Sequence, residues 1–136
     1  MVKSQYVSWS EIEITVQVIS KKILKSSKDF SSITTISRGG LIPSRLLADL
    51  LGIEKIFVDQ NTISSDSLFV DDIFDSGKTF SDVLSKVPDS SNLTFATLFA
   101  RRGVSYPEQL IYGDQTLDDS YLVFPWDKLE YEKSLK

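Results

Sequence analysis

The chain has 136 residues, and we expect residues 1–136 to form a single domain, because domains typically run from about 50 to about 250 residues. It has no cysteine and no histidine, which excludes disulfides, thiol nucleophiles and the commonest general base. The net charge of −4 argues against nucleic-acid binding, and no apolar stretch approaches the roughly 20 residues that span a membrane.

The first third of the chain predicts an amphipathic helix and then a buried strand. Residues 1–6 contain no apolar core of a signal peptide, so we expect a cytoplasmic protein. Ser10, followed by Glu11 and Glu13, is typical of a helix start, because acidic residues favour the positive end of the helix dipole. Apolar residues then recur at helical spacing, at Ile12, Val16, Ile19, Ile23 and Leu24. Residues 33–36 are β-branched throughout, which favours a short strand.

Helices and strands continue to alternate through the middle of the chain. Pro43 is expected to open a leucine-rich helix, and Gly52 follows at a position typical of a helix C-cap. The further elements expected are strands at residues 56–58, 67–70 and 94–99 and a helix at residues 78–86. This alternation predicts an α/β fold with a mainly parallel central sheet flanked by helices. Ligands of such folds bind at the carboxyl ends of the strands.

The strongest functional signal is residues 71–79, DDIFDSGKT, which follow a predicted strand. Backbone N–H groups at the turn, its hydroxyls and the dipole of the next helix can cradle one phosphate. The DSG portion alone is an ordinary turn or helix cap, but carboxylates beside an apolar strand lower stability unless a ligand compensates. A Walker-type P-loop is excluded, because the position where it requires its first glycine is Asp72.

A second, weaker signal is residues 36–43, ISRGGLIP, which follow the predicted strand at residues 33–36. An arginine and a glycine pair in this place suit an oxyanion and its counter-charge. A glycine pair alone is more often only a turn.

Residues 71–79 resemble the PRPP-binding signature of the type I phosphoribosyltransferases at nearly every position. Four further blocks resemble the bacterial xanthine-guanine phosphoribosyltransferases in the same order, at residues 6–9, 37–53, 97–101 and 124–127. The resemblance therefore covers most of the chain. It implies a type I phosphoribosyltransferase-like (Rossmann-like) fold with a short C-terminal hood segment.

The resemblance also implies a role for each candidate site residue. Asp71 and Asp72 would hold the PRPP ribose and Mg²⁺, the implied cofactor, and Asp75 would be the catalytic residue that takes the purine proton. The 5′-phosphate would be bound by Asp75, Ser76, Gly77, Lys78 and Thr79. The pyrophosphate would be bound by Ser37, Arg38 and Gly39, with a cis peptide expected between residues 37 and 38. The base would be bound by Arg101, Tyr121 and Leu122.

The implied activity is that of a purine-salvage glycosyltransferase (pentosyltransferase), which transfers phosphoribose from PRPP to hypoxanthine, guanine or xanthine. The implied partners are PRPP, a purine base and further copies of the chain in a dimer or tetramer, with no nucleic acid and no membrane. Two alternatives stay open: a transferase for another base, and a non-catalytic sensor of PRPP or a nucleotide. The sensor is favoured by residues 59–66, a short polar stretch where the family has a long closing loop. Tyr121 and Trp126 also fit a purely structural role as core or edge aromatics.

Overall fold

The fold is built on a five-stranded sheet with the strand order β3-β2-β4-β5-β6, in which all neighbouring strands are parallel. The computed structural model describes residues 3–135. The strands are β2 (Ser32–Thr35), β3 (Ile56–Val58), β4 (Ser67–Phe74), β5 (Thr94–Ala100) and β6 (Leu110–Gln115). The sheet predicted from the sequence is thus confirmed, and β6 adds an edge strand that the sequence did not indicate.

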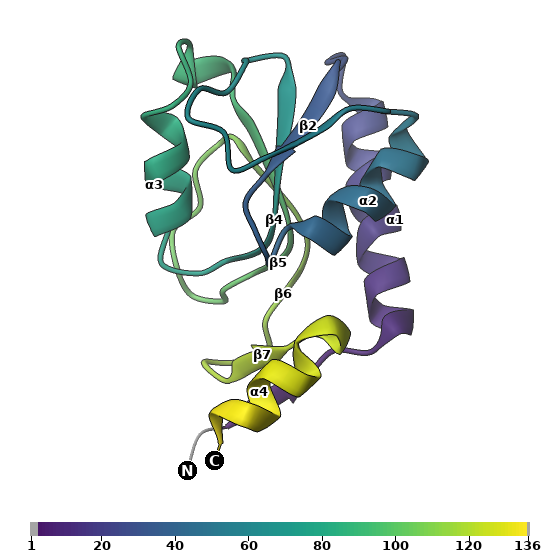
Figure 1. The fold of residues 1–136 in the computed structure, drawn as a ribbon, viewed down its shortest axis with the longest axis vertical. Coiled ribbons are helices and arrows are strands. Elements are labelled where there is room, and N and C mark those ends of the chain that lie inside the picture. The colour runs from purple at the N-terminus through teal and green to yellow at the C-terminus, as the bar shows by residue number, and fades with distance from the viewer. Residues whose placement is uncertain (1–2, 136) are drawn as a thin grey trace.

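Helices cover both faces of this sheet. Two of them, α1 (Trp9–Lys25) and α2 (Leu41–Leu51), lie on one face, and α3 (Lys78–Leu84) lies on the other (Figure 1). The helix α2 ends at Gly52, whose φ of 68° lies in the left-handed region that favours glycine. The predicted C-cap is therefore confirmed.

The helix α1 begins at Trp9, so the start predicted at Ser10 is wrong by one residue. The N-cap is Ser8, whose hydroxyl accepts the N–H of Glu11 while the glutamate side chain accepts the N–H of Ser8. Both serines are followed by a glutamate three residues later, so the capping pattern alone fits either start. The packing of Trp9 against Trp126, with ring centroids 5.7 Å apart, favours the earlier one.

Two apolar clusters hold the sheet between its helices. The larger cluster joins the sheet to α1 and α2 and includes Ile12, Ile19, Ile33, Leu47, Leu98, Phe99 and Phe124. The smaller cluster joins the sheet to α3 and is rich in aromatic residues, among them Phe69, Phe74, Phe80 and Phe95. The strand β4 contributes to both clusters, so the strand that carries the acidic pair is packed on its two faces.

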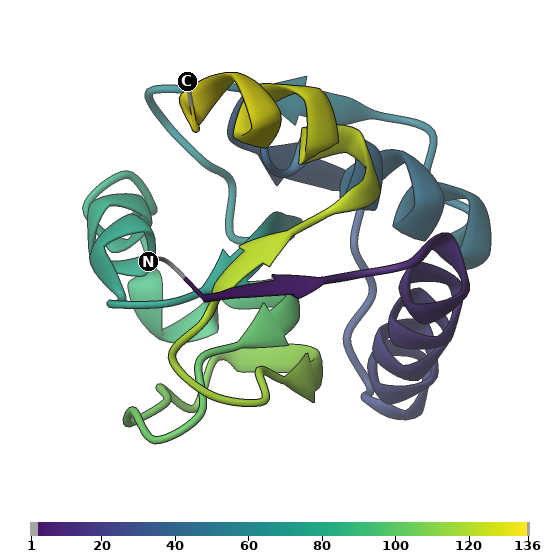
Figure 2. The ribbon, with the colours of Figure 1, turned by 90° about the horizontal axis from the view of Figure 1, so that it is seen from below.

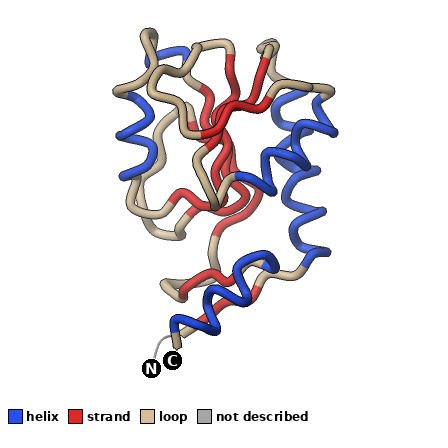
Figure 3. Tube along the Cα trace, viewed as in Figure 1, coloured by secondary structure: helices blue, strands red, loops and turns tan. Residues whose placement is uncertain are grey.

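A small hood lies beyond the carboxyl ends of the main strands. Its strands β1 (Ser4–Tyr6) and β7 (Tyr121–Val123) pair in parallel and run side by side across the molecule (Figure 2). The helix α4 (Lys128–Ser134) follows them and lies beside them (Figure 3). Trp126 stacks on Phe124 with ring centroids 5.0 Å apart and packs against the larger apolar cluster, as a structural role requires. Among residues 3–135, no helix has both the length and the apolar character needed to cross a membrane.

Candidate active site

The acidic pair of the DDIFDSGKT motif lies inside β4, because this strand continues to Phe74 instead of ending at residue 70. The carboxylate of Asp71 accepts the N–H of Asp72, and the carboxylate of Asp72 accepts the N–H of Ile73, both at 2.8 Å. Burial, and then the charge of Asp72, raise the pKa of Asp71 to about 8. Burial also raises the pKa of Asp72. Among residues 3–135 neither carboxylate has an ion-pair partner, so the pair favours a cation or a hydroxyl-bearing ligand.

The glycine loop of residues 37–40 packs directly against this acidic pair. The peptide bond between Ser37 and Arg38 is cis, as expected. A Cβ atom added to Gly39 would lie only 2.7 Å from a carboxylate oxygen of Asp72. A side chain at this position would therefore collide with the carboxylate, and glycine allows the two motifs to meet.

The short polar stretch at residues 59–66 is tied to the rest of the site. The N–H and the hydroxyl of Ser37 donate to the two carboxylate oxygens of Asp59, at 2.8 and 2.5 Å. The hydroxyl and then the N–H lower the pKa of this carboxyl. Ile63 is buried, and its N–H donates to the carbonyl of Lys86 at 2.9 Å. The stretch is thus anchored at both of these points and forms part of the wall beside the glycine loop.

The proposed phosphate cradle is residues 75–79, which comprise the turn after β4 and the first two residues of α3. Gly77 has a φ of 86°, in the left-handed region where residues with a Cβ are strained. The hydroxyl of Ser76 accepts the N–H of Lys78 at 3.4 Å. The turn and the acidic pair together line a cavity of about 160 Å³. All residues of the motif, from Asp71 to Thr79, thus line one cavity.

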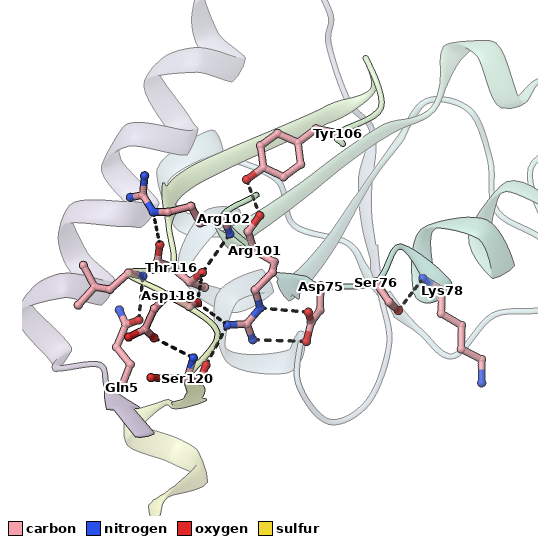
Figure 4. Close-up of polar contacts among 11 residues, drawn as sticks. Gln5, Asp75, Ser76, Lys78, Arg101, Arg102, Tyr106, Thr116, Asp118 and Ser120 are labelled. Carbon is pink, nitrogen blue, oxygen red and sulfur yellow. Dashed lines mark hydrogen bonds and ion pairs between the residues drawn. The ribbon is translucent and has the colours of Figure 1, made fainter. Parts of the chain in front are cut away.

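Arg101 lies beside Asp75, although the two residues belong to different motifs (Figure 4). The Nε atom donates to one carboxylate oxygen at 3.1 Å, and Nη2 donates to the other at 3.4 Å. The arginine side chain is 14% exposed, whereas that of Asp75 is 60% exposed. The ion pair therefore leaves the carboxylate open to a ligand while the guanidinium is shielded.

The ring of Tyr121 lies at the start of β7 and is stacked on the ring of Tyr131 from α4. Burial, and then the charges of Asp127 and Glu130, raise the pKa of Tyr121. The side chain of Leu122 is buried in the larger core cluster, so any contact of this residue with a base would come from its backbone.

The helix α4 also reaches the glycine loop. The Nη2 atom of Arg38 donates to the carboxylate of Glu130 at 3.0 Å, and both side chains are largely exposed. One helical turn therefore contacts both Arg38 and Tyr121. Sequence reasoning missed Glu130, because no local pattern links it to Arg38, which is 92 residues earlier. It also missed Tyr131, because the segment that carries this residue has no motif of its own.

No cluster of three or more acidic, cysteine or histidine side chains that could hold a metal occurs within the described residues. The unpaired carboxylates of Asp71 and Asp72 nevertheless fit Mg²⁺. This ion binds through one or two carboxylates and completes its octahedron with water and substrate oxygens.

No protein-family model matches the chain. The xanthine-guanine phosphoribosyltransferase of Chromohalobacter salexigens is 29% identical to it over 140 residues, which cover 89% of this chain and 82% of that protein. The xanthine-guanine phosphoribosyltransferase of Gluconobacter oxydans is 27% identical over 144 residues, with coverages of 89% and 83%.

Solved structures of similar fold include several phosphoribosyltransferases. The purine phosphoribosyltransferase from Pyrococcus horikoshii has a TM-score of 0.72 and 23% identity, over 91% of this chain and 93% of that chain. The xanthine-guanine-hypoxanthine phosphoribosyltransferase from Helicobacter pylori has a TM-score of 0.76 and 18% identity, over 96% and 99%. These likenesses confirm the fold predicted from the sequence.

Proposed function

The chain is a homologue of the xanthine-guanine phosphoribosyltransferases with the type I phosphoribosyltransferase fold, and from this premise we propose that it transfers phosphoribose from PRPP to a 6-oxopurine. The products are a nucleoside monophosphate and pyrophosphate. The observation that carries the proposal is the close approach of Asp72 to Gly39. It joins the acidic pair to the glycine loop at one edge of the sheet, so that the ribose and the pyrophosphate group of one PRPP molecule can be held together.

Each motif supplies one part of the PRPP site in this proposal. Asp71 and Asp72 hold the ribose hydroxyls and Mg²⁺, and the N–H groups of the turn at residues 75–79 hold the 5′-phosphate. Arg38 contacts the pyrophosphate with a planar guanidinium suited to phosphate oxygens. Mg²⁺, when bound, neutralises negative charge on the pyrophosphate and makes it a better leaving group.

In the reaction, the bond between the ribose C1′ and the pyrophosphate oxygen breaks, and a purine nitrogen forms the new bond to C1′. The bonding electrons leave with the pyrophosphate, and Arg38 stabilises the charge that they carry. Positive charge develops on the ribose beside the carboxylates of Asp71 and Asp72. The purine N–H proton passes to Asp75, whose carboxylate is open to a ligand.

Product analysis tests the proposal. Incubation with PRPP, Mg²⁺ and guanine should give guanosine monophosphate and pyrophosphate in equal amounts. Replacement of Asp75 by Asn should lower kcat by about 10²-fold or more, in line with the loss of a general base, while the Kd for PRPP changes little. Collapse of PRPP binding with normal turnover of bound substrate would contradict the role of Asp75. A cytoplasmic location and a dimeric or tetrameric state stay predictions, and sedimentation analysis checks the second.

A further inference from the structure

The guanidinium of Arg101 has five N–H donors, and four of them donate hydrogen bonds to other residues of the chain (Figure 4). The Nη1 group donates to the carbonyls of Asp118 and Ser120, at 3.0 and 2.8 Å. The Nε and Nη2 groups donate to the carboxylate of Asp75. The guanidinium therefore bridges the turn that follows β4 and the segment that leads into β7.

The backbone of Arg101 is held as closely as its side chain. Its N–H donates at 2.7 Å to the carbonyl of Phe74, the residue directly before Asp75. Its carbonyl accepts the hydroxyl of Tyr106 at 2.6 Å. The side chain of Arg101 is only 14% exposed, although the carboxylate that it contacts is 60% exposed. The backbone from which the guanidinium extends is thus held on both sides at the end of β5.

The segment that Arg101 contacts on its other side is itself folded into a tight turn. The N–H of Ser120 donates to the carboxylate of Asp118 at 2.8 Å, and the hydroxyl of Thr116 donates to the carbonyl of Asp118 at 3.0 Å. Ser120 directly precedes Tyr121. The contact of Arg101 with the carbonyl of Ser120 therefore acts one residue away from the ring proposed to stack on the base.

We infer that Arg101 is a positioning residue, which fixes the carboxylate of Asp75 relative to the segment that leads into β7. The proton acceptor Asp75 and the stacking residue Tyr121 can then contact the same bound base. The inference rests on the proposed function. It replaces the direct reading of the base that the resemblance implied for Arg101, since only one N–H, on Nη2, is left for a ligand among residues 3–135. A lysine ammonium lacks the planar guanidinium, so it cannot donate to the Asp75 carboxylate and to the carbonyls of Asp118 and Ser120 at the same time.

The inference is tested by a double-mutant cycle of Arg101→Gln and Asp75→Asn, with kcat and the KM values for PRPP and the base measured for each protein. We expect Arg101→Gln to lower kcat by about 10- to 100-fold with the KM for PRPP within about 3-fold of the wild type. The double variant should lose less than the product of the two single losses, because one residue acts largely through the other. Arg101→Lys should recover part of the loss.

Arg102 provides a matched control. Its Nε donates to the carbonyl of Thr116 at 2.9 Å, so it holds the same segment, and it makes no contact with Asp75 among the described residues. Arg102→Gln should leave kcat within about 2-fold of the wild type, as expected for a surface contact. Urea denaturation of each variant checks that it is folded. If Arg101→Gln does not fold, Arg101→Met, which also removes every N–H donor of the side chain, takes its place in the cycle with Asp75→Asn.

The positioning role would be overturned if the loss of kcat in the double variant equalled the product of the losses in the two single variants. So would a raised KM for the base with an unchanged kcat, which would make Arg101 a direct base ligand. If Arg102→Gln lost as much kcat as Arg101→Gln, the effect would come from any contact that stabilises the segment, and the inference would also be overturned. A wild-type protein that is inactive with every base would instead overturn the proposed function, and the inference with it.

Discussion

The ring of Tyr131 lies nearly parallel to the ring of Tyr121, with 17° between the planes and 5.5 Å between the centroids. A base that stacks on the same face of Tyr121 has to displace Tyr131. We therefore predict that Tyr131→Ala lowers the KM for the base. The gain should be at most about 10-fold, since an aromatic pair contributes roughly 0.5–1.5 kcal/mol.

Steady-state kinetics with the base varied at saturating PRPP measures this effect. Tyr6→Ala is the control, because Tyr6 forms a T-shaped pair with Tyr131 and no ring pair with Tyr121 among residues 3–135. An unchanged or higher KM in Tyr131→Ala would show that the ring pair does not compete with the base.

In the proposed site, Glu130 would compete with the pyrophosphate group for Arg38, because the two side chains form an ion pair. Glu130→Gln should therefore lower the Kd for PRPP. The change should stay below about 5-fold, because exposed ion pairs contribute at most about 1 kcal/mol, and it should shrink as salt is added. Isothermal titration at low and high ionic strength measures it. The control is Glu132→Gln on the same helix, because Glu132 is exposed and has no ion pair among residues 3–135. This variant should bind PRPP as the wild type does. Equal effects of the two substitutions on the Kd would show that net charge alone is responsible.

We predict that Asp71 makes the free energy of unfolding fall with rising pH. Its folded pKa is about 8 because of burial, and aspartate in an unfolded chain has a pKa near ~3.9. Between these values the folded chain keeps a proton that the unfolded chain releases, so the free energy of unfolding falls as pH rises through this window. Urea denaturation without ligands should show a shallower fall in Asp71→Asn, by at most about 1.4 kcal/mol per pH unit.

The control for this pH dependence is Asp82→Asn, at an exposed position on α3. It should keep the slope of the wild type. Identical slopes in the wild type and in Asp71→Asn would mean that Asp71 is ionised in the folded protein throughout this range.

The two glycines of the loop should respond differently to alanine. At Gly39 the new Cβ meets the side chain of Asp72, which can turn away, so Gly39→Ala should fold and bind PRPP at least about 10-fold more weakly. At Gly40 the Cβ would lie 2.7 Å from the backbone carbonyl of Val70, which cannot move without distorting β4. Gly40→Ala should lower the free energy of unfolding by about 1–3 kcal/mol or more. Equal stability of the two variants would contradict this difference.

Local chemistry was enough to predict four of the five strands of the sheet and to single out the two loops proposed to bind PRPP. The strands β2, β4 and β5 are short runs of mostly apolar or β-branched residues, and residues that suit an oxyanion follow β2 while residues that suit a cation lie within β4. The positions of Asp71, Asp72 and residues 75–79 around one cavity follow from a single motif on one strand.

What the sequence did not predict depends on contacts between distant segments. The strands β1 and β7 have three residues each and pair across more than a hundred residues, so neither has a recognisable period of its own. The edge strand β6, LIYGDQ, mixes apolar and polar residues because it is only partly buried. The contacts of Ser37 with Asp59 and of Arg38 with Glu130 likewise need the folded chain before they can be seen.

The central claim is tested most directly by pyrophosphate release from PRPP and Mg²⁺, with hypoxanthine, guanine, xanthine and adenine each supplied separately and a blank without base. The proposed function predicts release that depends on the base, with one or more of the three 6-oxopurines and not with adenine. Failure of every base, in a protein that still binds PRPP, would contradict transfer and make the chain a PRPP-binding module without turnover.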